Sequence, residues 1–328
     1  MIRHASSLAL LAASAAAAVA PDMPCVPLSN AAAPGVCMPL VGSGSGGYVG
    51  NATANPYGDY PECANDCFDA QCVAPDPAGW MSCGGYVQGA QMTWLQLGGR
   101  RIDNSDSYHN QRSVGIALRT FAKRSGTPRS ELWLTSKVGP YLPLGFNESL
   151  AQFANILGVT GASYVDLLLI HWPTCLGGGA TACTTTGLSS DPPCAFGAPT
   201  YDERECRLST WRALVQIWRS GGARAIGVSN FNASQLQEIA DAGLPLPAVT
   251  QNPFNIGHSA AEMDTLAYCK ANNISELLAI APAFRRRPAP APISPGAPTH
   301  QTPSTLPLTP HSLQRLLALR RAGPQDLP

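Results

Sequence analysis

The segment Gly98-Gly-Arg-Arg-Ile-Asp-Asn-Ser-Asp-Ser-Tyr-His-Asn-Gln-Arg-Ser-Val-Gly115 predicts a short strand, a polar turn and the start of a helix. The strand is expected at Arg101-Ile102, and apolar residues recur at helical spacing over 113–123. Between them, an acid, Asp103, and a phenol, Tyr108, lie five residues apart. In barrels of alternating strands and helices, catalytic groups gather at the carboxyl ends of strands. The alternative is that Asp103 caps the helix and Tyr108 only packs.

Strand and helix patterns alternate on both sides of this segment. The segment 37–47 is expected to be a short strand that leads into a glycine loop. Further strands are expected at 101–102, 132–136, 165–170, 225–228 and 248–251, and helices at 92–97, 113–123, 148–157, 209–219, 233–240 and 260–271. This alternation indicates an α/β fold with a parallel sheet or barrel. Gly42-x-Gly44-x-x-Gly47 matches the dinucleotide-binding fingerprint, but no helix pattern follows it, so we reject that interpretation.

Three further strands end in polar side chains. They are Leu132-Trp-Leu-Thr-Ser-Lys137, Tyr164-Val-Asp-Leu-Leu-Leu-Ile-His-Trp-Pro173 and Arg224-Ala-Ile-Gly-Val-Ser-Asn-Phe231. With the segment around Asp103, and in this order, they resemble the aldo-keto reductase family over about 38–274. The resemblance implies a (β/α)8 TIM-type barrel that reduces aldehyde or ketone carbonyls by hydride transfer from NADPH.

The resemblance implies a role for each of four catalytic residues. Tyr108 is the general acid, and Lys137 supplies the positive charge that favours a phenolate. Asp103 pairs with Lys137, and His171 donates a hydrogen bond to the substrate oxygen. Only 3 of the 21 basic residues are lysines, which favours a chemical role for Lys137. Taken singly, Lys137 could be a solvated rim residue and His171 a core histidine.

The same resemblance implies a binding site for the nicotinamide carboxamide at Ser229, Asn230 and Gln251. An amide side chain suits this partner because it donates and accepts hydrogen bonds at once. No metal site is expected. The sequence departs from the family pattern at Asn104, Ser105, Gln111 and Thr250.

The composition limits the partners and the compartment. The 328 residues are 45% hydrophobic and 13% charged with a formal net charge of zero, which gives no reason to expect nucleic acid as a partner. An apolar, alanine-rich run makes residues 1–20 a predicted signal peptide for the secretory pathway. The run is short and weakly apolar for a membrane anchor. We expect an exported monomer acting on a small carbonyl compound.

Ten of the eleven cysteines lie in loop-like segments, mostly in two expected insertions at 49–88 and 174–207. An even set behind a signal peptide predicts about five disulfides. Zinc bound by Cys63, Cys67, Cys72 and Cys83 is the weaker alternative, because no CxxC pair occurs there. Cys269 is expected to be a free buried thiol. Of the four Asn-x-Ser/Thr sequons, at Asn51, Asn147, Asn232 and Asn273, the first has the most loop-like context for a glycan.

The pattern fails after Ile274. The family continues with an aromatic residue on a seventh strand and a basic phosphate loop on an eighth. Here 275–284 reads as a degenerate seventh strand, and 285–328 as a proline-rich, disordered tail. We therefore predict a barrel over 25–284 that is incomplete at its carboxyl end, and we prefer a shifted reading frame or a retained intron as the explanation. The alternatives are a non-catalytic fragment that holds cofactor poorly and a secreted cysteine-rich binding protein.

Overall fold

The computed structural model describes residues 23–29, 35–46, 85–108, 110–140, 142–174, 189–253 and 259–279. The predicted signal peptide, the Asn51 sequon, the alternative zinc site and the predicted tail at 285–328 lie outside these residues. The greater part of the insertion at 49–88 and the first part of that at 174–207 also lie outside them.

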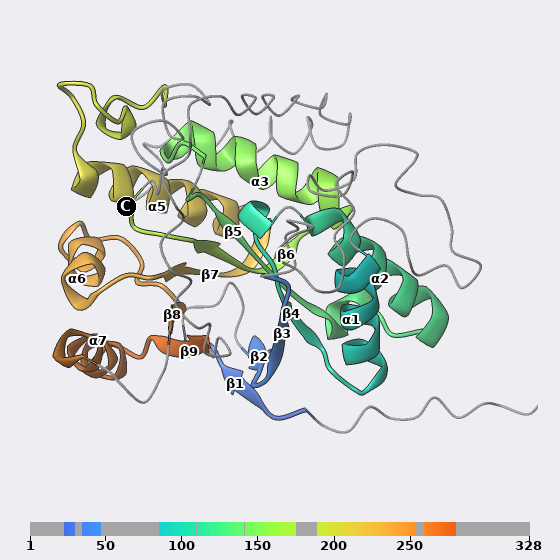
Figure 1. The fold of residues 1–328 in the computed structure, drawn as a ribbon. Helices are drawn as coiled ribbons and strands as arrows, with labels where there is room; N and C mark the ends of the chain where they lie inside the picture. The colour runs from blue at the N-terminus through green and yellow to red at the C-terminus, as the bar shows by residue number, and fades with distance from the viewer. Residues whose placement is uncertain are drawn as a thin grey trace, which may run out of the picture.

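A parallel sheet forms the centre of the molecule (Figure 1). Its strands follow the order of the chain: β3 (Gly42–Gly44), β4 (Arg101–Asp103), β5 (Trp133–Val138), β6 (Val165–Ile170), β7 (Ala223–Ser229), β8 (Val249–Pro253) and β9 (Ser275–Ala279). Each strand is parallel to its neighbours. The sheet curls as in a TIM-type barrel, and the degenerate strand expected after Ile274 is present as β9.

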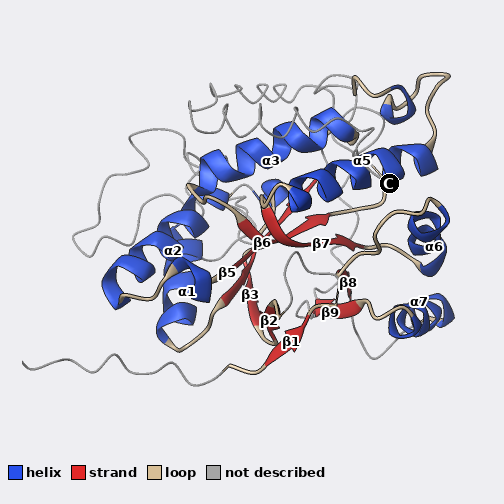
Figure 2. Ribbon diagram, turned by 180° about the vertical axis from the view of Figure 1, so that it is seen from behind, coloured by secondary structure: helices blue, strands red, loops and turns tan. Residues whose placement is uncertain are grey.

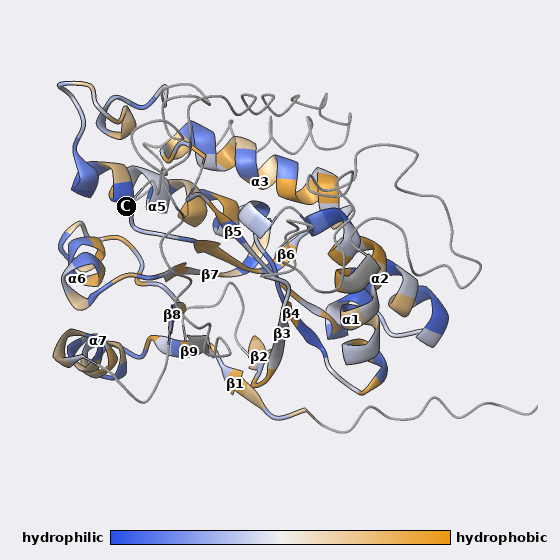
Figure 3. Ribbon diagram, in the orientation of Figure 1, coloured by the Kyte–Doolittle hydropathy of each residue, from blue (hydrophilic) through white to orange (hydrophobic). Residues whose placement is uncertain are grey.

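Helices cover the outer side of the curled sheet, as the view from behind in Figure 2 shows. They are α1 (Gly85–Gln96), α2 (Gln111–Ser125), α3 (Phe146–Thr160), α5 (Glu203–Arg219), α6 (Ala233–Asp241) and α7 (Ala260–Ala271). Apolar and hydrophilic residues alternate along α3 in Figure 3, because one side of this helix packs on the sheet. Among the described residues, no helix is long and apolar enough to cross a bilayer.

Two helices begin at least six residues earlier than the apolar spacing predicts. α1 begins at Gly85 and not at 92, and α5 begins at Glu203 and not at 209. The start of α5 is set by the side chain of Asp202, which accepts a hydrogen bond from the Glu205 backbone N–H at 2.9 Å. The second insertion, predicted to end at 207, therefore ends at this cap.

The segment 37–47, predicted as a short strand that leads into a glycine loop, contains two short strands. Cys37–Pro39 forms β2, which pairs antiparallel with β1 (Cys25–Pro27), and only Gly42–Gly44 joins the main sheet. The hairpin carries its apolar residues into the inside of the barrel, where Leu28 and Met38 pack in one cluster with residues of five strands. It closes the end of the barrel at which the strands begin.

Disulfides link two pairs of the loop cysteines, Cys25–Cys37 and Cys194–Cys206. The other six loop cysteines lie outside the described residues. Cys269 is a free buried thiol, as expected, and burial raises its pKa to about 12. This thiol therefore stays protonated and packs as a small apolar side chain.

Removal of the hairpin disulfide by Cys25→Ser with Cys37→Ser is expected to lower the free energy of unfolding by about 3 kcal/mol. The bond closes a loop with a sequence separation of 12 residues, so its loss frees the unfolded chain. Urea unfolding of both proteins, with and without reductant, measures the effect. A variant as stable as the oxidised wild type would contradict this prediction.

Candidate active site

The alternation of side chains along the strands places the predicted residues on the inner face of the barrel. Side chains two residues apart on a strand face the same side. On β6, Leu167 and Leu169 belong to the inner apolar cluster, so His171, the next residue in this series, also faces inward. On β5, Trp133 belongs to that cluster, and the same series leads to Lys137. Each series changes from apolar to ionisable side chains at the carboxyl end of its strand.

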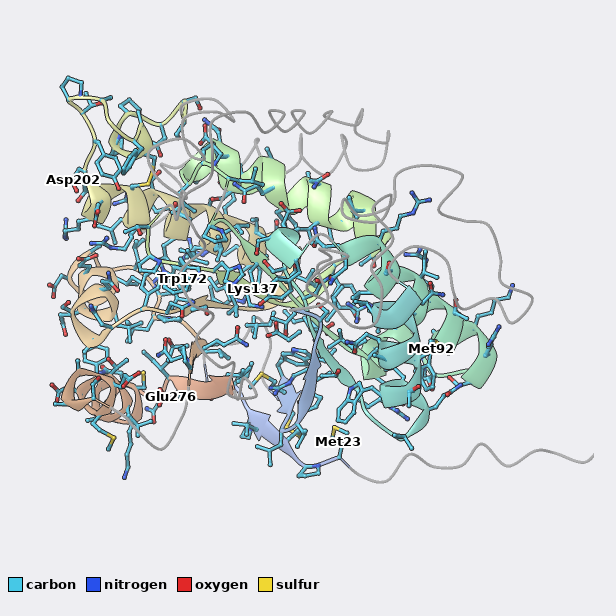
Figure 4. The ribbon with its side chains drawn as sticks, in the orientation of Figure 1. Met23, Met92, Lys137, Trp172, Asp202 and Glu276 are labelled. Atoms are coloured by element: carbon cyan, nitrogen blue, oxygen red, sulfur yellow. A yellow bond between two sulfur atoms is a disulfide. The ribbon has the colours of Figure 1, made fainter. Side chains whose placement is uncertain are left out.

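The ammonium group of Lys137 is the centre of the site. Lys137 is fully buried and forms an ion pair with Asp103 Oδ1. Its Nζ also donates to the backbone oxygen of Asn104 at 3.0 Å and to Tyr108 Oη at 3.2 Å. Figure 4 shows Lys137 near the middle of the molecule, among the strands. The structure therefore brings together three of the four residues predicted to be catalytic.

Lys137 is charged at neutral pH. Burial disfavours its ammonium form, but the negative charge of Asp103 and the contact with Tyr108 outweigh burial and raise the pKa of Lys137. A fixed positive charge therefore lies within hydrogen-bond distance of the Tyr108 phenol.

His171, the fourth predicted residue, lies beside Tyr108. The two rings meet edge to face with their centroids 5.5 Å apart. His171 is 8% exposed, and its pKa falls to about 3 because it is buried and because Lys137 is positively charged. His171 is therefore neutral at physiological pH, so it can donate a hydrogen bond without carrying charge.

The low pKa of His171 predicts a pH dependence of stability. In the unfolded chain a histidine takes up a proton near pH 6.5, whereas folded His171 does so near pH 3. Its contribution to stability is therefore complete above about pH 6.5 and is lost as the pH falls towards about 3. Between about pH 7 and about pH 4, the free energy of unfolding should fall by about 3 kcal/mol more in wild type than in His171→Asn. Chemical unfolding at the two pH values measures this difference. Equal losses would show that folded His171 protonates as readily as an exposed histidine.

The three residues predicted to bind cofactor border this group. Asn230 has a positive φ of 61° directly after β7, and its Nδ2 donates to the His171 backbone oxygen at 2.8 Å and to Ser229 Oγ at 3.0 Å. Gln251 Nε2 donates to Asp103 Oδ2 at 2.6 Å. Asp103 thus connects Lys137 to Gln251, which sequence reasoning did not predict.

Sequence reasoning also missed the surroundings of the His171 ring. Ser105 Oγ lies 2.9 Å and Ser107 Oγ 3.2 Å from His171 Nδ1. Ser105 was noted only as a departure from the family pattern. In the sequence, the only indication of these contacts is that both serines lie in the short turn between Asp103 and Tyr108.

Gln111, another departure from the family pattern, has a structural role. Its Nε2 donates to Asp106 Oδ1 at 2.7 Å, and its Oε1 accepts from Ser136 Oγ at 3.1 Å. Gln111 thereby ties the first turn of α2 both to the turn that carries Tyr108 and to β5.

A cavity of about 220 Å³ lies beside Asn230 at the carboxyl ends of β7 and β8. Trp172, which follows His171, lines it together with Phe231 and Asn252. The cavity therefore lies on the side of the barrel where the ionisable groups gather.

Comparison with known proteins agrees with this arrangement. Residues 88–282 match the model of the aldo/keto reductase family. The chain is 32% identical over 209 residues to aldo-keto reductase family 1 member A1 of Bos taurus, and the aligned region covers 62% of this chain and 59% of the relative. It is 33% identical over 180 residues to glyoxal reductase of Bacillus subtilis, which covers 55% of this chain and 52% of the relative. The chain spans only 52% to 62% of the length of four curated relatives that it matches.

Solved structures show the same fold. A Bombyx mori aldo-keto reductase in complex with NADP superposes with a TM-score of 0.54 at 22% identity, covering 78% of this chain and 65% of that one. Another aldo-keto reductase of the same silkworm has a TM-score of 0.57 at 22% identity, covering 84% of this chain and 69% of that one. The family model covers more than half of the 328 residues and includes all four predicted catalytic positions. The chain therefore belongs to the aldo/keto reductase family.

Proposed function

We propose that this protein reduces the carbonyl group of an aldehyde or ketone to an alcohol, with NADPH as the hydride donor and Tyr108 as the general acid. The observation that carries the proposal is the contact of Tyr108 Oη with the buried, charged ammonium of Lys137 at 3.2 Å. A phenol protonates an oxyanion near neutral pH only where its conjugate base is stabilised, and a neighbouring cation does this.

Each residue of the group has a separate task in the proposed reaction. NADPH, when bound, supplies the hydride for the carbonyl carbon. As charge develops on the substrate oxygen, Tyr108 Oη transfers its proton to that oxygen, and Lys137 stabilises the phenolate left behind. Asp103 keeps Lys137 in place through their ion pair. His171, neutral and beside Tyr108, orients the carbonyl by a hydrogen bond.

The described residues offer a primary carboxamide the hydrogen-bonding groups that it needs. Asn230 and Gln251 use their Nδ2 and Nε2 groups as donors to His171, Ser229 and Asp103. Their amide oxygens accept no hydrogen bond from another described residue, so they can accept from the carboxamide NH2. Ser229 Oγ accepts from Asn230 and so keeps its own proton for the carboxamide oxygen. This set would hold the nicotinamide end of the cofactor next to Tyr108.

We also propose that the protein is exported, folds in an oxidising compartment and acts as a monomer. The two disulfides support export, since such bonds are rare in reducing compartments. When the full-length sequence is expressed, we expect the chain to be secreted with an amino terminus near residue 21. We also expect its mass to shift on deglycosylation, because a glycan is predicted at Asn51.

A fluorescence titration of the oxidised, secreted protein with NADPH, followed by NADPH oxidation with an aldehyde, tests the proposed activity. We expect saturable binding and turnover. Lys137→Met should bind NADPH but reduce carbonyls poorly, whereas Lys270→Met, at an exposed position in the last turn of α7, should behave as wild type. A folded protein that binds no NADPH would instead be a non-catalytic relative that retains the four residues.

A further inference from the structure

Two serine hydroxyl groups converge on one nitrogen of His171. Ser105 Oγ and Ser107 Oγ lie 2.9 Å and 3.2 Å from Nδ1, and 3.0 Å from each other. The backbone N–H of Ser107 also donates to Ser105 Oγ at 3.3 Å. Ser105 is fully buried and Ser107 is half-buried, so these two oxygens and Nδ1 lie at the inner edge of the site.

The hydrogen bonds that Ser105 Oγ, Ser107 Oγ and His171 Nδ1 can form with one another decide which nitrogen of His171 is protonated. Among the described residues, the two hydroxyl protons have only Nδ1 and each other's oxygen as acceptors. If Nδ1 is unprotonated, Ser105 can donate to it and Ser107 can donate to Ser105, so both protons are used. If Nδ1 carries the proton, it cannot accept, and one hydroxyl proton has no protein acceptor. The leftover proton can belong to half-buried Ser107 and turn to solvent, so only the arrangement with unprotonated Nδ1 pairs every donor of these three groups inside the protein, and that arrangement is favoured.

The protonated nitrogen is then Nε2, on the opposite side of the ring. The main chain of His171 is held at the same time, because its N–H donates to the Val138 oxygen at 3.0 Å and its own oxygen accepts from Asn230 Nδ2 at 2.8 Å. With the backbone and Nδ1 both held, the ring has one orientation and one neutral tautomer. Nε2–H is the donor left to meet a substrate.

We infer that Ser105 and Ser107 are positioning residues that hold His171 as its Nε2–H tautomer and aim that donor at the carbonyl oxygen. The inference rests on the proposed function for its catalytic meaning, but the tautomer itself is a property of the free protein. It gives Ser105, which departs from the family pattern, a specific role in this chain.

Nitrogen-15 NMR of the histidine-labelled oxidised protein, without cofactor or substrate, tests the inference at neutral pH. The His171 signals are assigned by their loss in His171→Asn. We expect wild type to show His171 as the Nε2–H tautomer alone. In Ser105→Ala with Ser107→Ala, a second population with protonated Nδ1 should appear. Protonated Nδ1 in wild type, or an unchanged tautomer in the double variant, would overturn the inference.

Activity gives an independent second measurement. The double variant should lose about tenfold in kcat with an unchanged Kd for NADPH, as expected when one well-aimed hydrogen bond is weakened. Ser136→Ala, which removes another buried serine hydroxyl next to the site, should leave the His171 tautomer unchanged. Should the double variant not fold, Ser107→Ala alone changes only a half-buried side chain and should give a smaller shift in the same direction; no shift counts against the inference. A wild type without turnover but with the Nε2–H tautomer would refute the proposed function and not the tautomer.

Discussion

Tyr108→Phe is expected to lower kcat for carbonyl reduction by about 100- to 10,000-fold, the usual contribution of a positioned general acid. The substitution removes only the hydroxyl group that contacts Lys137 at 3.2 Å and leaves the ring in its edge-to-face contact with His171. Without that proton donor, the developing alkoxide must take its proton from water. The Kd for NADPH should not change, because none of the three residues expected to hold the carboxamide contacts the hydroxyl.

Single-turnover kinetics with NADPH and an aldehyde, together with a fluorescence titration, separate the two effects. Tyr268→Phe is the matched control, because this tyrosine packs at the outer apolar cluster, away from Lys137. It should retain wild-type kcat. A Tyr108→Phe protein that reduces aldehydes within a few-fold of wild type would show that another group donates the proton.

The second large effect is on stability: Asp166→Ala is expected to lower the free energy of unfolding by about 3 kcal/mol. The carboxylate of Asp166 is fully buried at the start of β6. Its Oδ2 accepts from Arg129 at 2.7 Å and from the Leu134 backbone N–H at 2.8 Å, and its Oδ1 accepts from Arg224 at 2.9 Å. The two arginines are 27% and 35% exposed and can turn to water, so the expected loss lies at the low end for a broken buried ion pair. The backbone N–H of Leu134 cannot turn.

Urea unfolding measures this loss, and Asp264→Ala, at an exposed position on α7, serves as the control that should change stability little. Because Asp166 lies at the opposite end of β6 from His171, Asp166→Ala protein that remains folded should keep the kcat of wild type. A loss below about 1 kcal/mol would mean that water replaces the carboxylate among its three partners.

Local sequence patterns were sufficient for most of the barrel. A run such as residues 167–170 of β6 is apolar at every position, which is the pattern of a strand covered on both faces. Once such a strand is recognised, the period of two along it places His171 on the same face as Leu167 and Leu169, and Lys137 on the same face as Trp133. The structure then shows that this face is the inner one. The identity of the family followed from the same residues, since the polar side chains at the strand ends carry its motifs.

The sequence alone therefore determined the strands, which side chains along a strand share a face, and, by resemblance to the family, the four candidate catalytic positions, because each depends on neighbours within a few residues. Only the tertiary structure decided the rest. The β1–β2 hairpin contains the Cys25–Cys37 disulfide, the Gln251–Asp103 hydrogen bond joins residues 148 apart, and the serine contacts of His171 span 64 and 66 positions. No local periodicity encodes these contacts, since they form only when the curled sheet brings the carboxyl ends of distant strands together.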